Sequence, residues 1–284
     1  MSDEEKHNYI LSNRRPINNS LLFRKKKLIQ EKIRIIDKNI DISDWVNKDI
    51  YLYVIDMTPM SKGRLFFYSA NGEDEVYIDY NFLKDNSNYE VIIHQLTHEL
   101  LHSLCQFMNQ KKIYQTFNHN WFDDDRIYRG IDEATTQMFT DEFETKKLNE
   151  EQDSNFYFIK NIMRILKVII GEKELLLQYL NRSDSFEQSF NNISNNKFIE
   201  FSKLINKIYC LNYEIFNKLK LRLDYSTDTI ELNDLKKEVI YIVNDIIKDS
   251  LILIPDLHNQ LETEFSDNNF YEEYFDVYNL NKSK

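Results

Sequence analysis

The chain has 284 residues, of which 42% are hydrophobic, so it can bury a core in one large domain or two smaller ones. Its formal net charge of −11 argues against nucleic acid as a partner, because binding phosphates requires clustered Lys and Arg. It contains only four glycines and three prolines, a composition that favours long helices.

The N-terminal residues and the cysteines bear on the compartment. Residues 1–6 lack the basic start and the apolar core of a secretory signal peptide. No run approaches the roughly 20 apolar residues of a membrane span. Cys105 and Cys210 stand far apart without a CxxC pairing, which favours reduced thiols. We therefore expect a cytoplasmic protein without a membrane span, or one exported without a cleaved N-terminal signal peptide.

Residues 1–44 are expected to form a polar, mildly basic lead-in segment. It contains one amphipathic helix, whose apolar positions fall between residues 28 and 36. The basic run at residues 24–27 indicates a solvated helix face rather than a nucleic-acid site.

Three short β segments follow. Residues 50–57 are dense in Tyr, Val, Leu and Ile and predict a buried strand. Residues 65–69 and 75–80 flank Asn71-Gly72, the dipeptide that best supplies the positive φ angles of a tight hairpin. These segments predict a small antiparallel sheet.

Helices are predicted for most of the remaining chain. Ser87 and Glu90 have the spacing of a capping box, so a helix should run from there to about Asn109 with its apolar positions buried. A second helix should open after Gly130, with acidic residues in its first turn. From residue 156 onward the sequence predicts an α-helical bundle, with helices at residues 156–170, 172–180, 196–223 and 232–254.

The first of these helices carries His98-Glu99-Leu100-Leu101-His102. Four residues make about one helical turn, so both imidazoles leave the same face and can converge on one tetrahedral metal ion. Glu99 lies about 100° around the helix from His98. There it can take a proton from a metal-activated water. The alternative reading is two core histidines beside a surface glutamate.

His94 extends the spacing, but its geometry argues against metal binding. At a rise of 1.5 Å per residue, the Cα atoms of His94 and His102 lie about 12 Å apart. Both rings could reach one ion only if it lay almost on the line between them, because metal–nitrogen bonds measure about 2.1 Å. We therefore expect His94 to be a buried polar residue or one that orients a ligand.

The pattern at His98, Glu99 and His102 resembles that of the zincin metallopeptidases. Cys105 and Met108 stand where the metzincin branch has Gly and His, so that branch is excluded. Residues 130–137 resemble the segment from which the gluzincin branch takes a glutamate as its third ligand. The resemblance covers about residues 75–145.

By this resemblance, Glu133 completes the metal site with His98 and His102. Ala134 would leave room beside the metal helix, and Thr136 or Gln137 would hold a ligand side chain. Gln137 departs from the acid that many gluzincins have at its position. The competing third ligands are Asp132, Glu142 and residues 123–125.

The resemblance implies an α+β chain of three segments. After the lead-in of residues 1–44, residues 45–150 would form a zincin-like metal-binding domain with the small sheet and the active-site helix. Residues 151–284 would form an α-helical domain. The strand at residues 75–80 would be either an edge strand that aligns an extended peptide or an ordinary strand of the sheet.

The resemblance implies that the protein is a zinc metallopeptidase and acts as an endopeptidase. Zn²⁺ would be its cofactor, and a peptide or protein would be its substrate. Glu99 would be the general base. An oxyanion-stabilising residue is also expected; Tyr128 is the first candidate, and Arg129, His119 and Tyr157 compete with it.

Two other functions are compatible with the sequence. One is a zincin-fold regulatory or partner-binding protein with a structural zinc or a single dedicated protein target. The other is a helical interaction protein without a metal. The cleavage specificity and the oligomeric state are not encoded in any pattern that we recognise.

Overall fold

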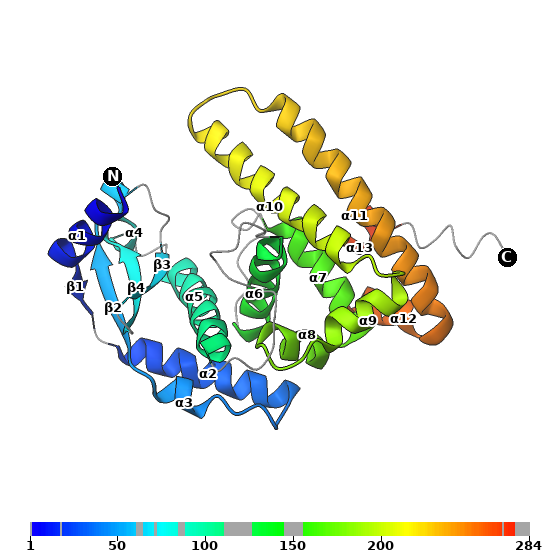
Figure 1. The fold of residues 1–284 in the computed structure, drawn as a ribbon, viewed down its shortest axis with the longest axis horizontal. Helices are drawn as coiled ribbons and strands as arrows, with labels where there is room; N and C mark the ends of the chain where they lie inside the picture. The colour runs from blue at the N-terminus through cyan, green and yellow to red at the C-terminus, as the bar shows by residue number, and fades with distance from the viewer. Residues whose placement is uncertain are drawn as a thin grey trace. The chain divides into compact units, whose positions relative to one another are not determined.

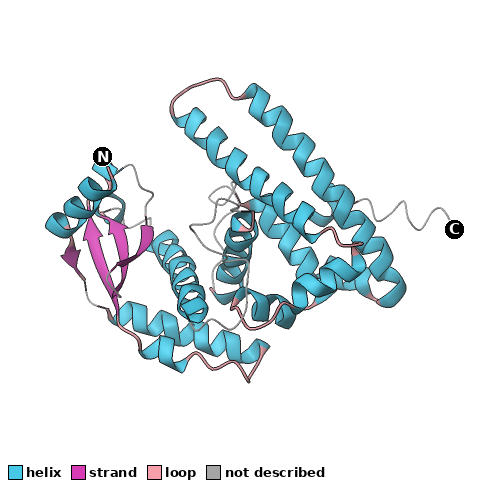
Figure 2. Ribbon diagram, viewed as in Figure 1, coloured by secondary structure: helices cyan, strands magenta, loops and turns pink. Residues whose placement is uncertain are grey.

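The computed structural model describes residues 2–17, 19–60, 65–70, 73–84, 89–110, 127–144, 156–268 and 270–275. These residues are mostly helical, with one small sheet (Figure 2). The chain divides into two units: Met1–Lys111 with Phe139–Asn149, and Lys112–Met138 with Glu150–Lys284. Helix α6 (Arg129–Phe143) contributes residues to both.

Residues 1–44 belong to the first unit with the sheet and helix α5, and one boundary between the units falls between Asn149 and Glu150. Helix α1 (Asp3–Asn13) begins with a capping box formed by Ser2 and Glu5. Its Ile10 is buried in a cluster with residues of the sheet. The apolar stripe of α2 (Ser20–Ile36) is likewise buried. The lead-in segment therefore supplies core residues.

The sheet contains four strands in the order β1-β2-β4-β3. Their bounds are Arg15–Pro16 for β1, Ile50–Ile55 for β2, Leu65–Ala70 for β3 and Glu73–Asp79 for β4. Three short helical elements neighbour the strands along the chain: α3 (Ser43–Asn47), α4 (Tyr80–Leu83) and the 3-10 turn η1 (Thr58–Met60). The predicted strands are thus confirmed within a few residues.

The predicted purely antiparallel sheet is wrong, because β2 and β4 pair in parallel from Ile50↔Asp74 to Ile55↔Asp79. β3 and β4 do form the predicted antiparallel pair, with Ala70 opposite Glu73; the turn residues Asn71 and Gly72 lie outside the described residues. This hairpin places its second strand beside β2. Patterning along the chain shows which segments are strands but not which strands become neighbours.

β4 is therefore a central strand, and the suggestion that residues 75–80 form a substrate-aligning edge is wrong. Its Val76, Tyr77 and Ile78 are at most 2% exposed, as expected for a strand that is covered on both faces and paired on both sides. Among the described strands, β1 and β3 lie at the edges.

The basic run on α2 is only in part the solvated face that the sequence predicts, because Arg24 and Lys27 are exposed but Lys26 is buried. Lys26 is 2% exposed, its Nζ donates to the carbonyl of Lys48 at 2.5 Å, and it lies 5.0 Å from the ring centre of Trp45. Lys25 pairs with the buried carboxylate of Glu144. Both contacts join residues far apart in the sequence, so local charge patterning does not reveal them.

Burial lowers the pKa of Lys26 from 10.5 to about 8, which predicts a pH-dependent stability. Between these values the unfolded chain binds the proton and the folded chain does not, so folding stability rises with pH. Relative to Lys26→Met, the parent should gain up to about 3 kcal/mol between pH 7 and pH 11. Urea unfolding of both proteins across this range measures the difference. A constant difference would contradict the buried charge.

Helix α5 (Tyr89–Gln110) is the central helix of the first unit. It begins within two residues of the predicted start; the predicted cap Ser87 lies outside the described residues. Its apolar side packs inward, and Leu96, Leu100, Leu101 and Leu104 are fully buried. Trp45 Nε1 donates to Ser103 Oγ at 3.2 Å, which ties α5 to α3.

The second unit is helical throughout its described residues (Figure 1). It contains α7 (Tyr157–Ile170), α8 (Glu172–Tyr179), α9 (Ser185–Ile193), α10 (Phe198–Lys220), α11 (Ser226–Leu253), α12 (Leu257–Glu264) and α13 (Phe270–Tyr274). The long helices α10 and α11 lie side by side. The predicted helical bundle is confirmed, and α9, α12 and α13 lie outside the four helix ranges predicted from the sequence.

Among the described residues, no helix has the length and apolar character needed to cross a membrane.

Candidate metal centre

The three residues proposed as metal ligands come together in the structure. His98 and His102 project from one side of α5, with their Nε2 atoms 3.0 Å apart. Glu133 projects from α6. One potential ligand atom from each of the three residues lies within 4.8 Å of the other two, so the group could hold a metal ion.

This geometry fits a metal ion after a small adjustment. Two nitrogen ligands on a tetrahedral ion with bonds of about 2.1 Å lie roughly 3.4 Å apart. The two imidazole nitrogens are within about 0.4 Å of that separation. The limit of 4.8 Å is longer, so binding would draw the ligand atoms together by up to roughly 1.4 Å. Two imidazoles and one carboxylate are donors that zinc accepts.

The burial pattern of α5 separates the ligand side from the core side. Leu100 and Leu101 are fully buried, whereas His98, Glu99 and His102 are partly exposed. The alternative of two core histidines predicts the opposite for the imidazoles. Water can therefore reach the side of the helix that carries Glu99.

The competing acidic residues are placed differently. Asp132 is 5% exposed and Glu142 is partly exposed, and neither belongs to the group formed by His98, His102 and Glu133. Residues 123–125 lie outside the described residues. Glu133 is 9% exposed, at the margin of burial.

His94 is a buried polar residue, as the spacing argument indicates. It is 2% exposed, and its Nε2 lies 2.7 Å from Asp141 Oδ1 on α6. The carboxylate thus holds the ring nitrogen that could otherwise be offered to a metal.

Gly130 brings the first turn of α6 against α10. A Cβ at Gly130 would lie 2.8 Å from both the Cα of Asn206 and the carbonyl oxygen of Ile205. The Gly130 N–H donates to Asn206 Oδ1 at 3.2 Å. Only glycine allows this approach, which fixes the turn of α6 that precedes Glu133.

The next turn of α6 is also anchored. Ala134 is fully buried. The Thr136 hydroxyl donates to the carbonyl of Asp132 at 2.8 Å and lies 2.8 Å from the Tyr179 hydroxyl. These contacts stabilise the backbone that carries Glu133. The resemblance implied a different role for Thr136, a contact with the side chain of a ligand.

The candidate oxyanion residues pack among the helices of the second unit. Tyr128 stacks on Phe198 with ring centres 6.1 Å apart, and burial, followed by the charge of Glu187, raises its pKa. Tyr157 meets the ring of Phe270 edge to face. His119 lies outside the described residues.

Tyr209 of α10 is a residue that the sequence analysis missed. The Arg129 guanidinium lies 5.2 Å from its ring centre. Burial raises the pKa of Tyr209, the charge of Glu133 raises it further, and Arg129 opposes them. The charge of the Glu133 carboxylate thus acts on the Tyr209 hydroxyl. With 18 tyrosines in the chain, no local pattern distinguishes this one.

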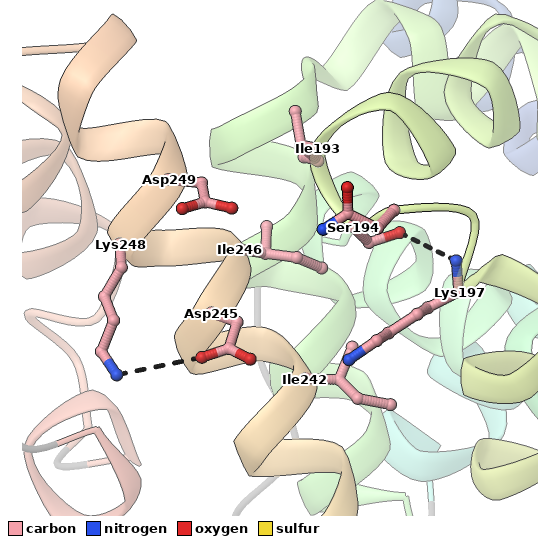
Figure 3. A pocket seen from close by; sticks show the side chains of 9 residues that line it. Ile193, Ser194, Lys197, Ile242, Asp245, Ile246, Lys248 and Asp249 are labelled. Atoms are coloured by element: carbon pink, nitrogen blue, oxygen red, sulfur yellow. Dashed lines mark hydrogen bonds and ion pairs between the residues drawn. The ribbon is translucent and has the colours of Figure 1, made fainter.

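A separate cavity of about 270 Å³ lies between the end of α9 and α11 (Figure 3). In it, Lys248 Nζ lies 3.9 Å from Asp245, and the Lys197 N–H donates to Ser194 Oγ at 3.2 Å. None of the predicted site residues lines this cavity.

Comparison with models of protein families, with curated proteins and with solved structures finds no match to this chain. We therefore infer the function of the chain from its own residues.

Proposed function

We propose that the protein is a zinc-dependent metallopeptidase. The observation that carries this proposal is the approach of His98, His102 and Glu133 to one another, with Glu99 on the same helix as the two histidines. Two imidazoles and a carboxylate make a three-ligand set, the composition of catalytic zinc sites that keep a position for water.

The proposed reaction is hydrolysis of a peptide bond. Bound zinc would lower the pKa of water and polarise the scissile carbonyl. Glu99 would accept a proton from the attacking water and pass it to the leaving amine. His98, His102 and Glu133 would hold the ion. Tyr128 remains a proposed donor to the developing oxyanion.

An extended substrate would need a strand with an unpaired edge. β4 cannot serve, since both of its sides are paired. β3 can, because it lies at the edge of the sheet and packs beside α5, the helix that carries Glu99.

The alternative is a partner-binding protein in which zinc is structural. A structural zinc site usually has four protein ligands. Among the described residues, the metal-binding group contains three.

Glu133 is the ligand to test first, against its neighbours on α6. A carboxylate that contacts zinc supplies both charge and a coordination bond, so Glu133→Ala should weaken zinc binding by more than the roughly 10- to 100-fold typical of residues that only support a ligand. Asp132→Ala and Glu142→Ala should have smaller effects. Zinc competition with a chelator measures all three.

Circular dichroism should show that the three variants remain folded, a necessary control because Asp132 is buried. If Asp132→Ala or Glu142→Ala weakens zinc binding most, α6 presents a different carboxylate and the glutamate-ligand assignment fails.

A further inference from the structure

We propose that a buried polar clamp sets the register of α5 against α6 and so brings Glu133 to the two histidines. The clamp consists of the His94–Asp141 pair and of Glu144 with its partners Thr97 and Lys25. The inference rests on the proposed function, since it assigns positioning residues to the same metal site.

The first part of the clamp joins α5 directly to α6. His94 Nε2 lies 2.7 Å from Asp141 Oδ1, a short polar contact. The two side chains are 3% and 14% exposed, so water competes little for either partner. A slip of one helix along the other would leave both groups buried without this contact.

The second part adds α2. Lys25 Nζ lies 2.5 and 2.6 Å from the two carboxylate oxygens of Glu144, and the Thr97 hydroxyl donates to the same carboxylate. The Glu144 side chain is 7% exposed. Thr97 immediately precedes His98, so this contact constrains the rotation of α5 at its first proposed ligand.

The clamp residues lie before the proposed ligands on α5 and after the proposed ligand on α6. His94 lies one turn before His98 on α5. On α6, Asp141 follows Glu133 by eight residues, or about 12 Å along the axis and about 80° around it. Glu144 follows Glu133 by eleven residues, which returns it to within about 20° of the same face.

The metal group tolerates little misalignment. Turning α6 by one residue rotates Glu133 by about 100° and shifts it by about 1.5 Å. Such a rotation would carry its carboxylate away from His98 and His102. Apolar packing is weakly directional, whereas buried polar pairs can specify register. Removing one partner of such a pair also destabilises the fold, so folding and metal affinity must be measured separately.

The test measures zinc affinity by chelator competition and the visible spectrum of the Co²⁺-substituted protein, which reports the coordination geometry. Asp141→Ala should weaken zinc binding roughly 10- to 100-fold and alter the Co²⁺ spectrum. His94→Gln should stay within a few-fold of the parent, because its amide N–H can donate to Asp141 from a similar position.

The chain offers a matched control in the second unit, where His258 Nε2 lies 3.0 Å from Glu262 Oε1. Glu262→Ala removes a histidine–carboxylate pair that is more exposed and lies within one helix, so it should change neither reading. Metal-free circular dichroism and urea unfolding report folding separately. If Asp141→Ala does not fold, the double variant His94→Leu with Asp141→Leu, which removes the contact and leaves neither polar group buried without its partner, carries the same expectation.

Parental zinc affinity and an unchanged Co²⁺ spectrum in the folded Asp141 variant would overturn the clamp. An equal loss in Glu262→Ala would overturn it as well, because the effect would then not depend on the α5–α6 contact. If the parent itself binds no zinc, the proposed function fails and this inference falls with it.

Discussion

The double substitution His98→Ala with His102→Ala is expected to remove bound zinc completely. It deletes two of the three donors and leaves Glu133 as a single carboxylate, which cannot hold an ion against a chelator. Elemental analysis of the purified proteins should give about one zinc per chain for the parent. The double variant should contain only background zinc.

Both histidines are partly exposed, so their loss should not unfold α5. Circular dichroism checks this expectation. His258→Ala, which removes a histidine of the second unit, is the matched control and should keep its zinc. Unchanged zinc content in the double variant would show that the metal binds elsewhere.

Glu99→Gln is expected to separate metal binding from catalysis. Glutamine keeps the size of the side chain but cannot accept the proton from water. Since Glu99 is not one of the grouped donors, zinc content should remain at the parental level. Loss of a general base should slow hydrolysis by roughly 10²- to 10⁴-fold.

The rates are compared on one peptide that the parent cleaves, with equal zinc loading confirmed for both proteins. Glu90→Gln is a suitable control, because it makes the same chemical change in the first turn of α5. Cleavage by Glu99→Gln at the parental rate would remove Glu99 from the mechanism.

Local patterns predicted the helices well. α5, α6 and α7 each carry enough apolar residues at helical spacing to place them within a few residues. The approach of His98 to His102 is also local, because a spacing of four residues on a helix fixes it. Glu133 is distant in sequence, and only the resemblance to a family pattern pointed to it.

Long-range features were not predictable in the same way. The parallel pairing of β2 with β4 depends on which strand of the β3–β4 hairpin lies next to β2. The burial of Lys26 and Lys25 depends on partners on other elements. The Arg129 guanidinium lies near the Tyr209 ring because of the packing of α10.

Three asparagines have a structural role that the amino-acid composition alone does not indicate. Asn181, Asn195 and Asn196 have positive φ angles after α8 and α9, where glycine commonly ends a helix. Asparagine tolerates this conformation better than most residues with side chains. With only four glycines, the chain uses asparagine at these two helix ends.

Digestion of a peptide library tests the central proposal most directly. The zinc-loaded parent is incubated with the library in ¹⁸O-enriched water, with and without a chelator, and mass spectrometry identifies the new C-termini. We expect chelator-sensitive cleavage that zinc restores, with ¹⁸O incorporated at each new carboxylate and little cleavage by Glu99→Gln. Zinc-loaded parent protein that cleaves no peptide, or that cleaves equally well with zinc removed, would contradict the assignment of a metallopeptidase.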